Sequence, residues 1–252
     1  MQTMLKTLDL NKKRSFFQKN GVVIFKNLMP RSIIKKCLSD LNKFDDLNYP
    51  KDKNIVLDRS MGKKYIRYFQ YLNLYVKSFD AFFNSKILNI SSHLLKDNSY
   101  FSSMNYHNKV PGGEGTPPHQ DNFYWCRKPN KALTAYIALN DQSNKNGGIE
   151  YFLGSHKLET FEHLSSTVKG FSSFIEQKKI PDLQILKPNL KMGDVIFHHC
   201  NVIHKAGKNN HKTVERKALA LAIYSFKSKI NERMLKKYKK NKLTAKNHKE
   251  NK

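Results

Sequence analysis

The chain of 252 residues is 39% hydrophobic and 12% aromatic, which suffices for a folded core and excludes a wholly disordered protein. Its formal net charge is +26, but this charge is spread along the chain without a recognised nucleic-acid-binding motif, so nucleic acid is not expected as the main partner. No apolar run approaches the ~20 residues of a membrane span and no secretory signal opens the chain, so no membrane partner is expected.

The first part of the chain, about residues 1–98, predicts mainly helices. A charged helical segment ends at the Asn20-Gly21 turn signal, and a short buried strand follows at Val22 to Phe25. Pro30 then begins a second helix with apolar residues at helical spacing. Between residues 45 and 98 we expect polar loops and one helix, within "YLNLYVKSFDAFFNSKILNISSHLL".

From about residue 99 to 226 the sequence predicts strands. Six β-branched or aromatic runs alternate with turn signals, from "YFSSMNYHNKV" and "ALTAYIALND" to "GDVIFHHCNVIH" and "RKALALAIYSF". So many strands imply a closed or double-sheet architecture, with the helices covering one face. The fold class is therefore mainly β with flanking helices, in a single domain over residues 1–226. The remaining residues, 227–252, form a basic tail that we expect to fray or to form a solvated helix.

The cysteines indicate the cellular compartment. The chain has three, Cys37, Cys126 and Cys200, and none forms a C-x-x-C pair. An odd and sparse set is a poor disulfide framework and a poor zinc site. Reduced thiols in a cytoplasmic protein are therefore expected.

The stretch "TPPHQDNFYW" places a histidine and an aspartate one residue apart. In an extended chain, residues i and i+2 point to the same side, so His119 and Asp121 could bind one metal ion. Two histidines and a carboxylate on one face of an ion are typical of non-haem Fe(II) oxygenases, because this set leaves coordination positions open. The motif therefore needs a second histidine from elsewhere in the chain.

Three histidines in "GDVIFHHCNVIHKAG" are the candidates for that second position. The apolar alternation puts His198 and His199 on opposite strand faces, and His204 stands at the edge of the next strand, before a glycine turn. Spacing alone does not choose among the three.

An arginine supplies the other half of such a site. An oxo-acid cosubstrate carries a far carboxylate, and the planar fork of arginine binds a carboxylate with two hydrogen bonds. Arg216 begins a strand twelve residues after His204, and Ala218, Ala220 and Ala222 share its strand face. The small alanines would leave room for a ligand under the guanidinium, whereas a surface arginine at a strand start is the other interpretation.

These motifs occur in a recognisable order. "HQD", "LTAYIALNDQSNKNGGIEYFLGSHK", "GDVIFHHCNVIHKAGKN" and "RKALALAIY" follow one another within residues 99–226, about half the chain. Together they resemble the phytanoyl-CoA dioxygenase family of Fe(II)/2-oxoglutarate-dependent oxygenases, and "FQKNGVVIFKNLMP" is similar to that family's usual start. The resemblance implies a double-stranded β-helix (jelly-roll, cupin-like) core. It also implies a hydroxylase that uses Fe(II), 2-oxoglutarate and O2 and that releases succinate and CO2.

The resemblance also assigns expected roles. The expected iron ligands and catalytic residues are His119, Asp121 and His204. Arg216 is expected to bind the far carboxylate of 2-oxoglutarate. His198 and His199 fall where the family varies, so they stay outside the ligand set, and either is a candidate to line the pocket. Related halogenases replace the carboxylate with a small residue, so Asp121 favours hydroxylation.

Several positions depart from the family pattern. The common interval between the distal histidine and the arginine is eleven residues, so the twelve found here imply a longer turn around "KNNHK". Ala206 stands where many relatives have a serine that helps to hold the cosubstrate. Tyr136 stands where many have tryptophan, and Trp125 matches a pocket tryptophan of some hydroxylases. Both aromatics, together with Asn108, are candidates for cosubstrate or pocket contacts, and plain barrel core is the alternative for the aromatics.

The resemblance does not select a substrate. The family acts on acyl thioesters, amino-acid derivatives, phosphonates and natural-product intermediates. The basic composition favours an anionic small molecule, which Lys109, Arg127 and Lys128 could meet beside the HQD strand unless they are ordinary surface charges. A non-catalytic jelly-roll binding protein is the main alternative. A nucleic-acid-binding or demethylating protein is less favoured, since "RKALALAIY" has no second arginine.

Overall fold

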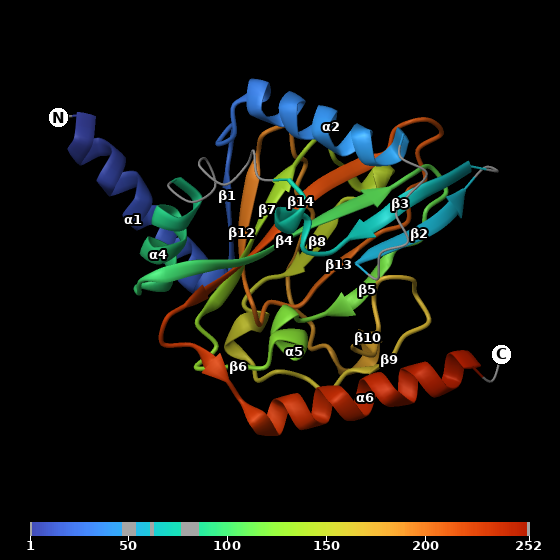
Figure 1. Cartoon of the computed structure of the whole chain (residues 1–252). Helices are drawn as coiled ribbons and strands as arrows, with labels where there is room; N and C mark the ends of the chain where they lie inside the picture. The colour runs from blue at the N-terminus through green and yellow to red at the C-terminus, as the bar shows by residue number, and fades with distance from the viewer. Residues whose placement is uncertain (1, 47–53, 61–62, 77–85, 251–252) are drawn as a thin grey trace.

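The computed structural model in Figure 1 describes residues 2–46, 54–60, 63–76 and 86–250. Two antiparallel sheets, of seven and four strands, form its centre. Three helices, α1 (Gln2–Asn20), α2 (Arg31–Asp46) and α4 (Leu88–Leu95), pack on one face of the larger sheet. The smaller sheet lies against the other face, so the two sheets enclose the interior of the barrel.

The strand order of each sheet follows from long-range pairing. In spatial order the larger sheet contains β1 (Val22–Phe25), β12 (Val195–His199), β7 (Ala132–Ala138), β14 (Arg216–Ser225), β4 (Ser99–Lys109), β3 (Lys63–Phe69) and β2 (Ile55–Ser60). The smaller sheet contains β11 (Ile185–Leu186), β8 (Ile149–Phe152), β13 (His204–Ala206) and β5 (Thr116–His119). This arrangement is the jelly-roll expected from the sequence.

Short elements connect the two sheets. Two pairs of strands lie outside them, β6 (Arg127–Lys128) with β15 (Lys229–Ile230), and β9 (Leu164–Ser165) with β10 (Ser173–Phe174). The short helices are α5 (Asp121–Trp125), η1 (Leu72–Leu74), η4 (Asn144–Asn146), η5 (Ser155–Lys157) and η6 (Gln177–Lys179). A long helix, α6 (Glu232–Glu250), follows β15.

Strand β14 shows how alternation builds the two faces of the larger sheet. Its leucines, Leu219 and Leu221, join the core beneath the helices, where they are fully buried. Its alanines face the other way, and Ala220 and Ala222 line the cavity between the sheets. Side chains of a strand alternate between faces, so one strand serves both the core and the cavity.

The structure confirms the predicted strand at residues 22–25 and the helix that follows Pro30. The prediction for residues 45–98 was partly wrong, because β2 and β3 extend the larger sheet there. Both strands carry charged residues, and β2 is the edge strand with β3 beside it, so their strand pattern is weak. Of the helix expected within residues 71–95, the structure has η1 and α4, and residues 77–85 lie outside the described part.

The basic tail forms helix α6, which is one of the two expected alternatives, but it is not solvated on every side. Tyr238 contacts the rings of Phe123 and Tyr124 from α5. The side-chain amide of Asn241 donates to the carbonyl oxygen of His163 and accepts from the Ser173 hydroxyl, both at 2.6 Å. The helix therefore lies across one end of the barrel (Figure 1). None of the described helices is long and apolar enough to cross a membrane.

Gly193 provides a test of the fold. It adopts a φ of +90°, its N–H donates to the carbonyl of Ala138, and a Cβ there would overlap the carbonyl oxygen of Met29. Gly193→Ala is expected to lower the free energy of unfolding by about 1–3 kcal/mol, measured by urea denaturation. Gly207→Ala is the control, because nothing lies within 4 Å of its Cβ position. Equal stability of the two variants would contradict the argument.

Candidate active site

Three of the predicted site residues meet between the sheets. His119 ends β5, Gln120 is extended with φ −121° and ψ 131°, and Asp121 begins α5. His204 begins β13 and pairs directly with His119 across the small sheet. One ligand atom from each of the three side chains lies within 4.8 Å of the others. The expected convergence is present, although Asp121 belongs to a helix rather than to the strand.

Backbone carbonyls set the orientation of the two imidazoles. His119 Nδ1 lies 2.9 Å from the Pro117 oxygen, and His204 Nδ1 lies 3.1 Å from the Val202 oxygen. Because a carbonyl only accepts, each Nδ1 carries the proton and each Nε2 keeps its lone pair. Burial lowers the pKa of both histidines below the usual 6.5, so both rings are neutral and able to bind a metal.

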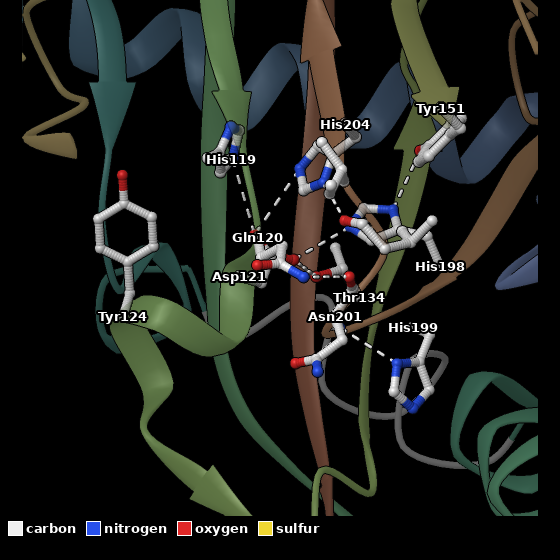
Figure 2. Close-up of polar contacts among 12 residues, drawn as sticks. His119, Gln120, Asp121, Tyr124, Thr134, Tyr151, His198, His199, Asn201 and His204 are labelled. Carbon is white, nitrogen blue, oxygen red and sulfur yellow. Dashed lines mark hydrogen bonds and ion pairs between the residues drawn. The ribbon is translucent and has the colours of Figure 1, made fainter. Parts of the chain in front are cut away.

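The two oxygens of Asp121 have different surroundings, as Figure 2 shows. Oδ2 accepts hydrogen bonds from Thr134 Oγ1 at 2.6 Å and from His198 Nε2 at 3.0 Å. Oδ1 instead lies 3.8 Å from Nε2 of His119 and 3.7 Å from Nε2 of His204. Two nitrogen lone pairs and one carboxylate oxygen therefore face a common point.

The charge of Asp121 suits that arrangement. Burial alone would raise the pKa of this carboxyl, but the hydrogen bond from His198 outweighs burial and holds the pKa well below 3.8. His198 is fixed in turn, because Tyr151 donates its hydroxyl proton to His198 Nδ1 at 3.0 Å. The buried chain Tyr151–His198–Asp121 thus presents an ionised carboxylate with one oxygen saturated and one directed at the histidines.

The sequence left open which of the adjacent histidines faces the interior. His198 does, while His199 lies on the opposite face of β12, where its ring contacts Phe17 and His156. Thr134, the other partner of Asp121, was not predicted. It lies opposite His198 in the pairing of β7 with β12, a long-range contact that leaves no local signal in the sequence.

The hydrogen bonds to Asp121 lead to a prediction. Removal of either donor, by His198→Phe or Thr134→Val, is expected to weaken Mn(II) binding by about 10–100-fold, because the carboxylate loses its orientation. Electron paramagnetic resonance of free Mn(II) measures the affinity. His198→Gln, which can still donate to Oδ2, should lose less, and His199→Gln should bind as wild type does. Wild-type affinity in the first two variants would contradict this role.

The cluster opens into a cavity of about 750 Å³. Arg216 lies at one end with 6% of its surface exposed. Its Nη1 donates to the Tyr136 hydroxyl at 3.2 Å, and Tyr136 donates to Gln142 Oε1 at 2.8 Å. Arg216 Nε has no partner, and no carboxylate of the described residues pairs with this guanidinium. A buried cation without a counter-charge is costly, so this end of the cavity suits an anionic ligand.

The longer turn before Arg216 does not displace it. Asn209 is fully buried in that turn, and its side-chain amide donates to the carbonyl oxygens of Lys109 and Val214, both at 2.9 Å. Lys217 points away and pairs with Glu215 at 2.7 Å. The loop that contains the additional residue is thus held in place by Asn209, and Arg216 still lines the cavity.

Of the three remaining candidates for pocket contacts, two line the cavity and one does not. Trp125 lines the cavity with its ring 5.1 Å from that of Tyr224, and Tyr136 lines it beside Arg216. Asn108, the third candidate, is not among the residues that line the cavity. The alternation of β4 turns Asn105 and His107 inward, and Asn108 to the other face.

His107 was missed, because a histidine flanked by asparagines looked like an ordinary polar residue. It lies 4.8 Å from the ring of Tyr68 and 6.1 Å from that of Phe171. Burial, followed by the charge of Arg216, lowers the pKa of His107 to about 3. It is therefore a neutral wall of the cavity, and no charge is expected there at neutral pH.

Of the three cations beside the HQD strand, only Arg127 lines the cavity. Lys109 is 3% exposed and donates to the carbonyls of Gly147 and Gly207, and Lys128 is exposed to solvent. Of these three residues, only Arg127 is therefore placed to contact an anion bound in the cavity.

Comparison with known proteins places this geometry in a family. The model of the family described as "Phytanoyl-CoA dioxygenase (PhyH)" matches residues 17–218. A probable alpha-ketoglutarate-dependent hypophosphite dioxygenase of Stutzerimonas stutzeri is 28% identical over 63% of this chain and 57% of its own length. The peroxisomal phytanoyl-CoA dioxygenase of Homo sapiens is 25% identical over 81% of this chain and 66% of its own. The chain thus spans less than two thirds of these relatives.

Solved structures share the fold. The epimerase SnoN, in complex with Fe3+, alpha ketoglutarate and nogalamycin RO, superposes with a TM-score of 0.72 at 18% identity, over 89% of this chain and 87% of that one. EctD from S. alaskensis, with 2-oxoglutarate and 5-hydroxyectoine, also gives a TM-score of 0.72, at 16% identity over 87% of this chain and 77% of that one. Given the family match over most of its length, the chain belongs to the phytanoyl-CoA dioxygenase family.

Proposed function

We propose that the protein is an Fe(II)- and 2-oxoglutarate-dependent dioxygenase that hydroxylates a small molecule and releases succinate and CO2. The observation that carries this proposal is the joint presence, in one cavity, of a His-Asp-His cluster and a buried arginine without a counter-charge. Two neutral histidines and one carboxylate are the donor set of non-haem Fe(II) oxygenases. A non-catalytic binding protein would have no need to keep both features.

The residues present fit an iron ion. His119 and His204 would bind it through Nε2 and Asp121 through Oδ1, since these atoms face one another and Oδ2 is already saturated. When bound, the iron supplies the oxidising chemistry with O2 and the oxo acid. The protein holds the ligands in place through the Pro117 and Val202 carbonyls and keeps bulk water from the site.

Arg216 would hold the far carboxylate of 2-oxoglutarate. The Tyr136 hydroxyl accepts a hydrogen bond from this guanidinium and donates its own proton to Gln142, so it holds the arginine in position for the carboxylate. Ala206 lacks the hydroxyl that many relatives have. Thr116 pairs with Ala206 across the sheet and lines the same cavity, so it is our candidate for the replacement donor.

We further propose an anionic substrate and a cytoplasmic location. The cavity wall includes four cationic residues, and Asp121 is the sole carboxylate among the described residues that line it. The name of one relative specifies hypophosphite, a small anion. The three cysteines are free and buried, as is usual in a reducing compartment.

An anaerobic titration tests the proposed cofactors. Fe(II) and 2-oxoglutarate added to the metal-free protein should give a weak visible charge-transfer band near ~500 nm, as expected of an oxo acid chelated at a facial-triad iron. Admission of O2 should then consume 2-oxoglutarate and form succinate. A folded protein that gives neither the band nor succinate would refute the proposal and favour a binding protein.

A further inference from the structure

A second arginine without a counter-charge lies at the other end of the cavity. Arg127 Nη1 donates to the Ser228 carbonyl at 3.2 Å, and its guanidinium lies 4.1 Å from the centre of the Tyr224 ring. Its Nε has no partner, and no carboxylate of the described residues pairs with it. The Nε and Nη2 protons lie on the same edge of the guanidinium, and neither is donated to a described residue, so this edge has unused hydrogen-bonding capacity for an oxyanion.

The backbone holds this arginine firmly. Arg127 N–H donates to Asn122 Oδ1 at 2.9 Å, and Asn122 Nδ2 donates back to the Arg127 carbonyl at 3.2 Å. Arg127 also pairs with Ile230 in the β6–β15 ribbon. The backbone of Arg127 is fixed by these bonds, and its guanidinium is fixed by stacking on the Tyr224 ring. Such a cation loses less conformational entropy on binding a ligand than a mobile surface lysine does.

Strand β14 gives the order of the parts along the cavity. Arg216 begins the strand. Further along, Ala222 pairs with Thr134, which contacts Asp121. Near the end of the strand, the ring of Tyr224 stacks against the guanidinium of Arg127. The two arginines therefore stand at opposite ends, with the metal cluster between them. Ala222 and Tyr224 are two residues apart, or roughly 7 Å along the strand. The metal cluster is thus nearer to the Arg127 end.

The charges that face this end are positive. Lys242 of α6 lines the cavity near its mouth and is exposed. Lys205 also lines the cavity but pairs with Glu150. The one described carboxylate that lines the cavity is Asp121, whose Oδ2 is already occupied by two donors. Arg127 therefore has no competing acceptor within the cavity.

We propose that Arg127 is the anchor for an oxyanion of the primary substrate, a carboxylate or a phosphoryl group. The substrate class is a small oxyanion whose reacting carbon lies a short distance from the charged group, because the metal cluster is close to Arg127 along β14. This proposal rests on the proposed function, since it assigns the opposite end to 2-oxoglutarate. It makes Arg127 a specificity-determining residue.

The only tryptophan of the chain supplies the measurement. Trp125 lines the same end of the cavity and contacts Tyr224, so its fluorescence reports on this end alone. The protein is loaded with Mn(II) and saturating 2-oxoglutarate, which occupies Arg216, and is titrated with benzoate, inorganic phosphate or neutral benzamide at constant ionic strength. The variants are Arg127→Gln, Arg127→Lys and, as a matched control, Lys128→Gln, which removes an exposed charge one residue away.

Saturable fluorescence changes with benzoate or phosphate are expected in the wild type and in Lys128→Gln, and none with benzamide. Arg127→Gln should bind the anion about 30-fold more weakly or worse, and Arg127→Lys should lie between, because it keeps the charge but not the fork. Comparison of benzoate with phosphate identifies the oxyanion. Equal affinity in Arg127→Gln, or no response of the wild type to either anion, would overturn the proposal.

The proposed function is tested separately in the same samples. Affinity for 2-oxoglutarate should be unchanged in Arg127→Gln, which also shows that the variant is folded. If the wild type fails to bind 2-oxoglutarate, the proposed function fails, and the anion titration of the metal-free protein still decides the role of Arg127.

Discussion

The variant His204→Ala is expected to lose the visible band of the anaerobic Fe(II)–2-oxoglutarate complex completely. His204 is proposed to supply one of the three ligand atoms, and its Nε2 lies 3.7 Å from Oδ1 of Asp121. Loss of residues that merely orient ligands costs about 10–100-fold in metal affinity, so loss of a ligand should cost more than about 100-fold. Titration with Fe(II), followed by absorbance, measures this.

His199→Ala is the matched control for His204→Ala. It also removes a histidine close by in sequence, but this half-buried ring lies on the face of β12 that points away from the cavity, where it contacts Phe17 and His156. Its band should equal that of the wild type. If both variants lose the band, the loss reflects the barrel as a whole, and if neither does, His204 is not a ligand.

The second large effect is expected at Arg216. Arg216→Met should raise the dissociation constant for 2-oxoglutarate by roughly 30-fold or more, since truncation of one partner of a buried charge pair costs about 2–5 kcal/mol. Fe(II) binding in the absence of 2-oxoglutarate should be unchanged, because Arg216 contacts Tyr136 and none of the three ligands. Titration with 2-oxoglutarate at fixed Fe(II) separates the two.

Lys217→Met tests whether position or only charge matters at this end. Lys217 is the next residue along β14 but points away from the cavity and pairs with Glu215. The Lys217→Met variant should bind 2-oxoglutarate with the affinity of the wild type. An equal loss in both variants would show that the net charge of the protein, rather than the buried fork of Arg216, attracts the cosubstrate.

The sequence predicted the parts of the site that lie within single strands. The face shared by Arg216 and the alanines of β14 and the opposite faces of His198 and His199 follow from a period of two residues. His119 and Asp121 do converge, but Asp121 begins α5 and does not continue the strand. Asn108 follows His107 along β4, and its side chain lies on the face that points away from the cavity. The sequence alone did not show which face of β4 points into the cavity.

What the sequence could not predict depends on contacts between distant segments. The hydrogen bond from Thr134 to Asp121 joins β7 to α5. The backbone carbonyls of Pro117 and Val202 orient His119 and His204, and the identity of a residue does not show where its carbonyl points. The free edge of Arg127 also has no local signal, because it depends on the absence of an acid among the described residues that surround it. Strands β2 and β3 were missed because charged residues interrupt the strand pattern of the edge strand β2 and of its neighbour β3.

The residues that control access to the cavity come in part from helix α6, whereas the proposed metal and oxo-acid site does not. The ligands and Arg216 all come from the barrel and from α5, whereas Tyr238 and Lys242 reach the same cavity from the carboxyl-terminal helix. Substitutions in that helix can alter what enters the cavity without changing the residues that are proposed to hold the metal and the oxo acid. Substitutions on the cavity side of this helix, or a tag fused to it, are therefore expected to change substrate selectivity before they change the proposed chemistry.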